Sequence, residues 1–448
     1  MFANMLVKSA LLASFAISAT NAIATITTLG NKFFDSDGNQ FFMKGETVAV
    51  SSWARTLLIR RLGVAYQLTE KDPLINTDQC KLDASLMKDL GANTIRVYHV
   101  DASGDHDGCM SAFSDAGVYL LVDLDTFNTA INPFERYAAV MDAFANYDNT
   151  MGFFVGNEVV ALNNQSLAAP YVKAAARDLK AYRNSKNYRE IPVGYSAADI
   201  AELRPMLQNY LACGTNSSES IDMFGLNAYE WCGDVNLQTS GYDTLNTYAK
   251  SLNVPIFFSE TGCNTNRPRT FDDQSAIFGP DMNDNWSGAI VYEWIEEANT
   301  YGLISYGSTV AATAIATNVQ GGYSIAGTPT PISPDFSNLQ AQWKTLTPSG
   351  VKSSAFTPSI TAPACPASTS GGWLVDGDVK LPSVGETEAT GTATATSSGT
   401  ASATGTAASA SASATGKKNG GANTNGGKEV AGMSVGLAGV MIGFMYWL

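Results

Sequence analysis

Short apolar runs alternate with helical segments along most of the chain. Seven runs of six to nine residues are largely apolar, at 93–98, 118–124, 151–158, 191–196, 223–231, 255–260 and 288–294. Nearly continuous apolar runs of this length are typical of parallel strands covered on both faces. Helical patterns lie between them at 83–90, 134–147, 168–184 and 242–252. This alternation predicts a parallel α/β fold.

An eighth strand precedes these seven, in two pieces at 41–45 and 64–67. Eight strand–helix units predict a (β/α)8 TIM barrel with its active site at the C-terminal ends of the strands. Polar or aromatic residues stand at those ends, namely Gln67, Tyr98, Asp123, Asn157, Glu158, Tyr229, Glu260 and Tyr292. The alternative is an open doubly wound sheet, but no Gly-rich phosphate loop follows the first strand.

The composition of the chain disfavours several kinds of partner and site. A net charge of −14 and a pI near 4.6 argue against nucleic acid as a partner, because its phosphates would be repelled. Only two histidines are present, His99 and His106, which disfavours a His-based zinc site and a Ser-His-Asp triad. We therefore expect neither a metal nor a cofactor.

The N-terminal residues predict a secreted protein. Lys8 precedes an apolar run at 9–17, and Ala22-Ile23-Ala24 has the form of a signal-peptidase site. We expect a signal peptide at 1–24, cleaved after Ala24 or, as second choice, after Ala22. A buried N-terminal helix is the alternative.

The C-terminal residues predict a lipid anchor on the outer face of the cell membrane. Residues 389–416 are entirely Ala, Ser, Thr and Gly, which predicts an O-glycosylated stalk over 381–418. A small-residue site, a polar spacer and an apolar tail then fill 419–448, the pattern of a GPI-attachment signal. Asn419 is the expected attachment residue, with Gly420, Gly421 and Asn423 as competitors. No basic residues follow the tail, as they normally would after a membrane span.

Six cysteines and three sequons fit the secretory pathway. The even cysteine count indicates three disulfides, with 15 possible pairings: the cysteines are Cys80, Cys109, Cys213, Cys232, Cys263 and Cys365. Asn164, Asn216 and Asn285 open N-x-S/T sequons and are candidate glycosylation sites.

Glu158 and Glu260 are the strongest candidates for catalysis. Each ends an apolar run and has a glycine within two residues. A carboxylate in a cleft costs desolvation free energy, so it needs partners or a chemical role. Two carboxyls facing one cleft are what glycoside cleavage requires, one to protonate the leaving oxygen and one to attack the anomeric carbon. For either glutamate taken singly, a structural ion pair is the more ordinary explanation.

Several long motifs in order resemble one family. "GFFVGNEV" at 152–159 and "IFFSETGCN" at 256–264 resemble the acid/base and nucleophile motifs of the fungal GPI-anchored β-1,3-glucanosyltransferases, glycoside hydrolase family 72. The similarity continues through "VAYQ", "NTIRVY", "KAAARDLKAY", "KNYREIPVGYS", "NAYEWCG" and "WSGAIVYEW". It covers residues 25 to 350, the range that we assign to the catalytic barrel.

The resemblance implies a role for each matching residue. Glu158 would be the general acid/base and Glu260 the nucleophile of a retaining double displacement, and Asn157 would hold the sugar 2-hydroxyl. The remaining strand-end residues would line the glucan cleft: Gln67, Tyr98, Asp123, Tyr229 and Tyr292. For Tyr98 and Tyr229, ordinary packing within the barrel is the alternative.

The resemblance also implies a covalent framework. The disulfides would be Cys80–Cys109, Cys213–Cys365 and Cys232–Cys263, with a C-terminal extension at 351–380 tied by Cys365. This is the form of the family without a cysteine-rich carbohydrate-binding domain. The implied partners are β-1,3-glucan donor and acceptor chains, and we expect a monomer.

Three departures from the family stand out. In the family the first strand reads "KG" directly into "VAYQ", whereas here 46–63 intervene, with three arginines and one acid. We interpret these 18 residues as an unspliced intron, because they keep the reading frame and their removal restores a single Gly before Val64. A genuine surface insertion is the rival interpretation. The segment after Asp123 is shorter than usual, and Thr261 replaces a common Tyr.

Other functions remain open at this stage. The sequence predicts an enzyme that cleaves β-1,3-glucan internally and transfers the fragment to the non-reducing end of another chain. A hydrolytic endo-β-glucanase could share the barrel and both glutamates. An inactive wall-binding protein is a further alternative, if the insertion is real and disrupts the cleft.

Overall fold

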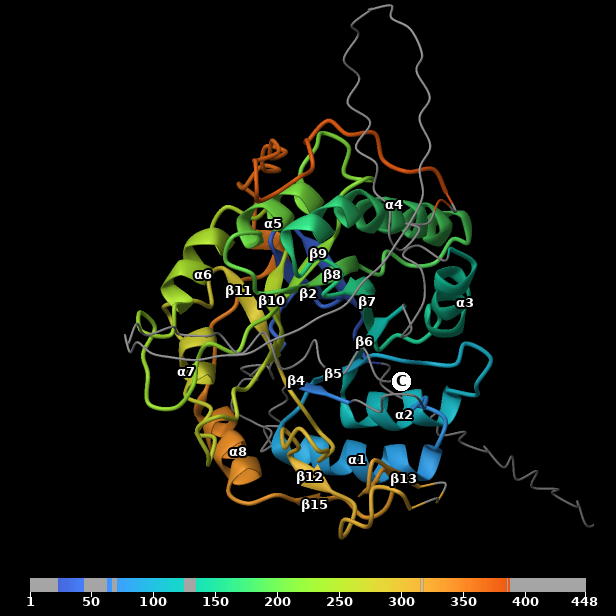
Figure 1. Ribbon diagram of the computed structural model, residues 1–448. Coiled ribbons are helices and arrows are strands. Elements are labelled where there is room, and N and C mark those ends of the chain that lie inside the picture. Colours follow the sequence, from blue (N-terminus) through green and yellow to red (C-terminus); the bar gives the residue numbers. More distant parts are fainter. Residues whose placement is uncertain are drawn as a thin grey trace, which may run out of the picture. The chain divides into compact units, whose positions relative to one another are not determined.

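Eight parallel strands form a closed barrel that helices surround (Figure 1). The structure is a computed structural model, and it describes residues 23–43, 63–66, 71–124, 134–314, 316, 318–384 and 386. Around the barrel the strands follow the order β10-β11-β4-β5-β6-β7-β8-β9. The prediction of a (β/α)8 TIM barrel is therefore confirmed.

The barrel strands coincide with the predicted apolar runs. Their bounds are β4 Gly63–Ala65, β5 Thr94–Val97, β6 Tyr119–Asp123, β7 Thr150–Asn157, β8 Val193–Ala198, β9 Met223–Asn227, β10 Ile256–Thr261 and β11 Trp286–Val291. The main difference lies at 223–231, where the strand ends at Asn227 and Tyr229 belongs to the following loop. Side chains of one strand face alternate sides, so one set fills the barrel and the other packs on the helices.

The helices pack their apolar faces on the outside of the barrel. Their bounds are α1 Thr77–Leu90, α2 Asp107–Ala116, α3 Phe134–Phe144, α4 Ala169–Ser185, α5 Arg204–Ala212, α6 Tyr242–Ala249, α7 Asp273–Ile277 and α8 Asp335–Thr345. Helix α1 starts earlier than predicted because the Asn76 side chain accepts a hydrogen bond from the Gln79 amide, and it stops at Gly91, which is left-handed. Short 3-10 turns occur at Asn163–Ala168 and Ser353–Ala355.

A small antiparallel sheet lies at the N-terminal end of the barrel, and the sequence pattern did not predict it. It contains β1 Ile26–Leu29, β2 Lys32–Asp35 and β3 Gln40–Phe41. Assigning Phe41 to the first barrel strand was wrong, since Phe41 pairs with Phe33 of this sheet. The sheet's aromatic rings meet residues inside the barrel, as Phe41 does with Tyr119 at 5.0 Å between ring centroids. It therefore covers the end of the barrel opposite the active site.

Four further short strands lie in the loops after β11. They form two antiparallel pairs, β12 Ile304–Ser305 with β15 Thr330–Pro331 and β13 Val319–Gln320 with β14 Tyr323–Ser324. These pairs order the long connection between the last barrel strand and α8.

The first barrel strand keeps its register across the insertion. Met43 pairs with Gly288 of β11, whereas Gly63 pairs with Ile290, two residues further along the same strand. One residue fits between these positions, the place that Lys44 would take if a single glycine joined it to Val64. Residues 44–62 lie outside the described part of the chain. This register supports the interpretation that 18 residues are extra, which stays a prediction.

The buried carboxylate of Asp83 in α1 is hydrogen-bonded to residues that follow the adjacent strands β4 and β11. The Asp83 carboxylate accepts hydrogen bonds from the hydroxyls of Tyr66 at 2.8 Å and Tyr306 at 2.7 Å. Gln79 and the Trp294 indole also donate to it, at 3.0 and 3.2 Å. Asp83 is fully buried, so these neutral donors replace the water that its charge loses. The seam between β4 and β11, next to the insertion, is thus held by polar contacts as well as by strand pairing.

All three implied disulfides are confirmed. They are Cys80–Cys109, Cys213–Cys365 and Cys232–Cys263. The second joins the end of α5 to the C-terminal extension, whose Trp373 is fully buried against Tyr210 at 5.4 Å between ring centroids. Arg177 of α4 donates to the Pro382 carbonyl. The extension therefore packs along α4 and α5 instead of leaving the barrel directly.

Several predicted features lie outside the described residues. These are most of the signal peptide, the insertion except Gly63, most of the stalk, and the anchor signal with Asn419. Among the described helices, none has the length and apolar character needed to cross a membrane. The sequon residues Asn164 and Asn216 are exposed, while Asn285 is half-buried and donates to Asn246 at 2.9 Å.

We expect deletion of residues 46–63 to stabilise the barrel. The deletion joins Gly45 to Val64 and removes the entropy cost of closing an 18-residue loop inside a strand, about 2 kcal/mol. The free energy of unfolding in urea, measured with the disulfides intact, should rise by that amount. A variant lacking only 46–62 is the control, because its one extra residue shifts the strand register and should destabilise the protein. Equal stability of the two deletions would contradict the prediction.

Candidate active site

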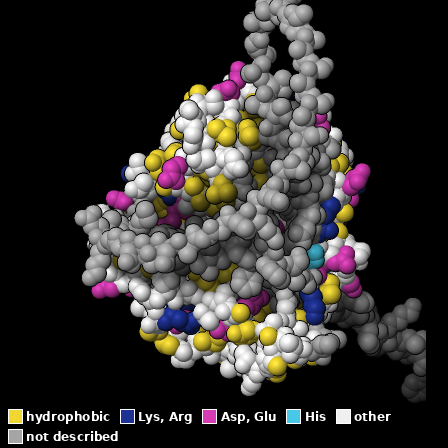
Figure 2. Space-filling view, viewed as in Figure 1, with side chains coloured by type: hydrophobic (Ala, Val, Ile, Leu, Met, Phe, Trp, Pro, Cys, Tyr) yellow, Lys and Arg dark blue, Asp and Glu magenta, His cyan; other side chains and the backbone are white. Residues whose placement is uncertain are grey.

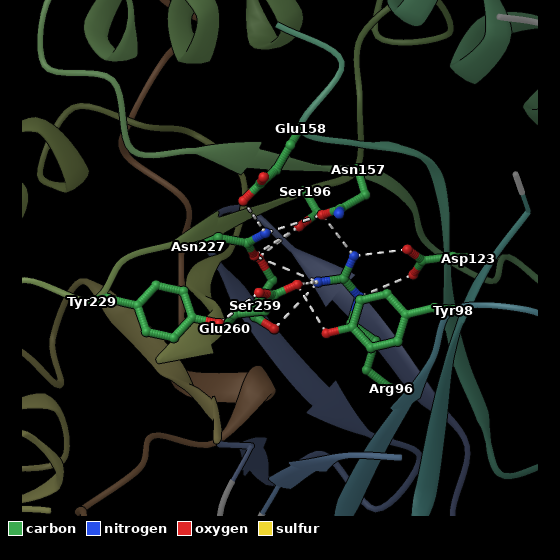
Figure 3. Close-up of polar contacts among 10 residues, drawn as sticks. All are labelled: Arg96, Tyr98, Asp123, Asn157, Glu158, Ser196, Asn227, Tyr229, Ser259 and Glu260. Carbon is green, nitrogen blue, oxygen red and sulfur yellow. Dashed lines mark hydrogen bonds and ion pairs between the residues drawn. The ribbon is translucent and has the colours of Figure 1, made fainter. Parts of the chain in front are cut away.

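Strands β7 and β10 place the two glutamates at the same end of the barrel. Glu158 directly follows β7, and Glu260 is the penultimate residue of β10. The pairing of β10 with β9 shifts register between Phe258 and Glu260. Such an irregularity re-aims side chains, and here Ser259 and Glu260 both reach the barrel interior. Figure 3 shows the two carboxyl groups approaching the Asn227 side chain from opposite sides.

Glu260 is buried and held by three donors. Its Oε1 accepts hydrogen bonds from the Tyr98 hydroxyl at 2.9 Å and from the Arg96 Nη1 at 3.2 Å. Its Oε2 accepts one from the Tyr229 hydroxyl at 2.7 Å. Only 6% of the residue is exposed. The carboxylate is therefore fixed in position, as an attacking group has to be.

Opposing effects set the protonation of Glu260. The pKa of the Glu260 carboxyl is raised to about 7, because burial, together with the charge of Glu158, outweighs the donors around it. The Arg96 guanidinium and the hydroxyls of Tyr229 and Tyr98 lower the pKa in return, because they stabilise the charged form. The ionised form that a nucleophile needs thus depends on these donors.

Glu158 lies in a more open setting. Its residue is half-buried, and its Oε1 accepts a hydrogen bond from the Asn227 amide at 2.8 Å. Its backbone has a positive φ of 52°, a conformation that non-glycine residues rarely adopt and that is concentrated at functional sites. A carboxyl that is open on one side and oriented on the other suits proton exchange with a bound molecule.

Asn227, which the sequence analysis did not single out, orients Glu158. Its Oδ1 accepts hydrogen bonds from Ser196 at 3.0 Å and Ser259 at 2.7 Å. The two serines fix which way the amide points, so its NH2 group faces Glu158 and the Asn157 Oδ1, the latter at 3.0 Å. An asparagine ending the apolar run "MFGLN" was the available signal.

Arg96, also missed, lies at the centre of the site (Figure 3). Its guanidinium is fully buried and forms a bidentate pair with Asp123, at 3.0 and 2.7 Å. It also donates to Glu260 and to the Asn157 Oδ1. The signal was an arginine inside the apolar run "NTIRVY", two residues before Tyr98 and hence on the same face of the strand.

The structure brings most of the predicted residues together. Tyr98, Asp123, Asn157 and Tyr229 join both glutamates in one hydrogen-bonded network. Tyr292 meets Tyr229 edge to face, with 6.4 Å between ring centroids. Gln67 lies outside the described residues. Contact of these residues with a sugar stays a prediction, and the hydroxyls of Tyr98 and Tyr229 already serve Glu260.

Thr261, the departure beside Glu260, does not open into this network. Its buried hydroxyl donates to Asp273 of α7 at 3.1 Å and lies 3.2 Å from the Tyr242 hydroxyl. An effect of this residue on acceptor choice would therefore have to be indirect. In the part of the chain that the structure describes, no group of three His, Cys, Asp or Glu side chains could hold a metal ion.

Tyr229→Phe should raise the pKa of Glu260. The substitution removes a hydroxyl that donates to the charged carboxylate, which we expect to raise that pKa by about one unit. A carboxyl-labelled NMR titration would measure it, with the Glu260 resonance identified by its absence in Glu260→Gln. Tyr171→Phe, outside the network, is the matched control. An unchanged or lower pKa would show that the hydroxyl does not stabilise the ionised form.

Arg96→Met should strongly destabilise the fold. It leaves the buried carboxylates of Asp123 and Glu260 without their cation, a loss that we expect to lower the free energy of unfolding by about 3–5 kcal/mol near neutral pH. Denaturant unfolding measures this loss. Burial already raises the pKa of both carboxyls and loss of the cation raises it further, so the deficit should shrink as the pH falls and they become protonated. A deficit that is small, or that does not depend on pH, would contradict this reading of Arg96.

A family model and the sequences of known proteins point to the same family. The family model described as glucanosyltransferase, glycoside hydrolase family 72, matches residues 15–321. The 1,3-beta-glucanosyltransferase gel1 of Aspergillus fumigatus is 39% identical over 390 residues, covering 84% of this chain and 78% of that protein. Protein EPD1 of Candida maltosa is 38% identical over 382 residues, and the match covers 82% of this chain but only 64% of EPD1. The chain thus spans less than two thirds of the length of some curated relatives.

A solved structure shows the same relationship in three dimensions. Saccharomyces cerevisiae Gas2p, as a mutant in complex with laminaritetraose and laminaripentaose, has a TM-score of 0.68 and 36% sequence identity. The match covers 81% of this chain and 75% of that one. With a family model that matches more than half of its residues, and with the barrel and strand-end glutamates in place, the chain belongs to glycoside hydrolase family 72, the glucanosyltransferases.

Proposed function

We propose that the protein is a β-1,3-glucanosyltransferase that lengthens β-1,3-glucan. The carrying observation is the pairing of two unlike carboxyls on one barrel face: Glu260 is buried and held by cationic and hydroxyl donors, whereas Glu158 is open and oriented by an amide. Relatives that carry the glucanosyltransferase name, and a neighbour solved with laminari-oligosaccharides, support the choice of substrate.

The first step would form a glycosyl-enzyme. Glu260 attacks the anomeric carbon of an internal β-1,3 linkage, while Glu158 gives its proton to the departing glycosidic oxygen. The bond from the anomeric carbon to that oxygen breaks as the bond to Glu260 forms. Asn157 lies next to Glu158 and is held by Arg96 and Asn227, which leaves it placed to hold the sugar 2-hydroxyl.

The second step would release the enzyme and decide between transfer and hydrolysis. Glu158, now a carboxylate, takes the proton from the non-reducing 3-hydroxyl of another glucan chain as that oxygen attacks the anomeric carbon, and the bond from this carbon to Glu260 breaks to return Glu260 as a carboxylate. Water in the same place would give hydrolysis. Two inversions at one carbon retain the β configuration.

We also propose that the mature protein works outside the cell on a GPI anchor, joined by a glycosylated stalk. The secretion and attachment patterns support this location, as do three disulfides, which persist in oxidising compartments. On the face shown in Figure 2, acidic side chains are dispersed among uncharged ones, and basic side chains form only small separate groups. A neutral polysaccharide requires no charged surface for binding.

Product analysis on reduced laminari-oligosaccharides tests the proposal. Products longer than the substrate show transfer, because only a new glycosidic bond can lengthen a chain. Only shorter products would show an endo-β-glucanase. We expect longer products from the wild type, and a loss of about 10³-fold or more in turnover for both Glu260→Gln and Glu158→Gln.

The same variants distinguish an inactive wall-binding protein. Binding of laminari-oligosaccharides without any turnover, unchanged by Glu260→Gln, would favour that alternative. Restored turnover on deleting 46–63 would instead show that the insertion, and not the site, had prevented catalysis.

A further inference from the structure

A buried carboxyl that the mechanism does not use lies beside the network of Glu260. Glu293 follows Tyr292 just after β11 and is fully buried. Its Oε1 accepts a hydrogen bond from the Asn299 amide at 2.7 Å, while its Oε2 is buried without a hydrogen-bond partner. The Tyr292 hydroxyl is close enough to this carboxyl to stabilise its charged form, but it makes no hydrogen bond to Oε2. A carboxyl oxygen without a partner at zero exposure calls for a physical explanation.

The charges around Glu293 are negative. Glu297 in its own loop and Glu260 of β10 both oppose its ionisation, and the tyrosines that face it, Tyr292 and Tyr301, are uncharged when protonated. Among the described residues, no guanidinium forms an ion pair with Glu293: Arg96 pairs with Asp123 and Glu260, and Arg267 and Arg269 both pair with Asp335. Burial, and then the charges of Glu297 and Glu260, raise the pKa of Glu293 well above its usual range, although the Asn299 amide and the Tyr292 hydroxyl lower it in part. An ionised Glu293 would be a buried charge without a cation.

We propose that Glu293 is a positioning residue that acts as a neutral carboxylic acid, with its protonated oxygen donating to the Tyr292 hydroxyl. Its carbonyl oxygen is the one that accepts from Asn299. This arrangement satisfies the lone Oε2 and leaves the Tyr292 hydroxyl its own hydrogen to donate.

The rings of Tyr292 and Tyr229 connect Glu293 with Glu260, the proposed nucleophile. Tyr292 lies edge to face against Tyr229, whose hydroxyl donates to Glu260 at 2.7 Å. Tyr301 also meets both rings edge to face, at 5.3 Å from Tyr292 and 5.7 Å from Tyr229. Fixing Tyr292 therefore helps to fix the donor of the nucleophile. Ionised Glu293 would do the reverse, adding negative charge that raises the pKa of Glu260.

The hydrogen bonds of the Glu293 backbone are independent of its side chain, so the side chain can be substituted without losing them. The Glu293 amide donates to the Tyr301 carbonyl at 3.2 Å, and its carbonyl accepts from Leu303 at 3.0 Å. These bonds do not involve the carboxyl, so the loop keeps them when the side chain is replaced. Gln is a neutral isostere whose NH2 group can donate to Tyr292 and whose oxygen can accept from Asn299.

The test compares Glu293→Gln with Glu293→Leu, and it rests on the proposed function for its kinetic part. We expect Glu293→Gln to keep kcat/KM within about threefold and to leave the acid limb of its pH profile unmoved, because one neutral group replaces another. Glu293→Leu should lose about tenfold or more and move the acid limb to higher pH, because Tyr229 is then less well fixed on Glu260. A purely structural role would lower the amount of folded enzyme without moving that limb.

Glu296→Gln is the matched control, since it makes the same change in the same loop at a half-buried carboxyl whose charged neighbours are Arg267, Arg269 and Asp335. Two outcomes would overturn the proposal. Glu293→Gln could lose as much activity as Glu293→Leu, or its acid limb could move to lower pH, as it would on removing a negative charge.

An infrared difference spectrum, wild type minus Glu293→Gln, separates this proposal from the proposed function. The band of a neutral buried carboxylic acid should appear in the wild type at about pH 7, where an ordinary Glu is ionised. Its absence would overturn the proposal whether or not the protein turns over glucan. A wild type that shows the band but neither transfers nor hydrolyses would instead count against the proposed function alone.

Discussion

The buried guanidinium of Arg96 is the interaction on which the site depends. It belongs to β5 and joins five strands of the barrel, because its hydrogen-bond partners come from β6, β7, β9 and β10: Asp123, Asn157, Asn227 and Glu260. A cation with no exposure has to be surrounded by acceptors, or its desolvation would outweigh the packing that it permits. The guanidinium in turn helps to fix the position of Glu260 and stabilises the charged form of that carboxyl.

The two halves of the site differ because their surroundings differ. Charged and hydroxyl donors converge on Glu260, so this carboxyl is held in position and its negative form is stabilised. A single amide orients Glu158, which keeps one side accessible for proton exchange. Asn227 donates to Glu158, and its own amide is oriented by Ser196 of β8 and Ser259 of β10. The position of Glu158 therefore depends on these two buried serines. Two chemically identical side chains therefore lie in different environments, which is the condition for the different roles that we propose for them.

The shortest strand of the barrel is the one that the sequence interrupts. Strand β4 has only three residues, yet it has to close the barrel between β11 and β5. Met43 continues the same line of pairing, and the Asp83 cluster fastens the adjoining helix to this seam. Because Met43 and Gly63 both pair with β11 in one continuous register, closure of the barrel is specified by these flanking segments and by β11.

The sequence by itself determined the barrel, the strand ends, both glutamates and most of their neighbours. Apolar runs of strand length and polar residues at their ends are local signals, and strand ends in a parallel barrel must meet at one face. The disulfide pairing came from family resemblance, because cysteine spacing alone left 15 arrangements. The N-terminal sheet was missed, since its strands are only two to four residues long and gain stability by covering the barrel.

Only the tertiary structure decided what each polar side chain contacts. Arg96 and Asn227 stand in apolar runs, where their identity shows that something unusual is present but not which acceptors surround them. Tyr98 and Tyr229 were expected to line a cleft, and their hydroxyls proved to bind Glu260, 162 and 31 residues away along the chain. The sequence pattern gave no sign of Glu293, which the structure distinguishes by a buried carboxyl oxygen without a hydrogen-bond partner. Hydrogen bonding and burial join residues that are distant in the chain, so no local pattern of amino acids encodes them.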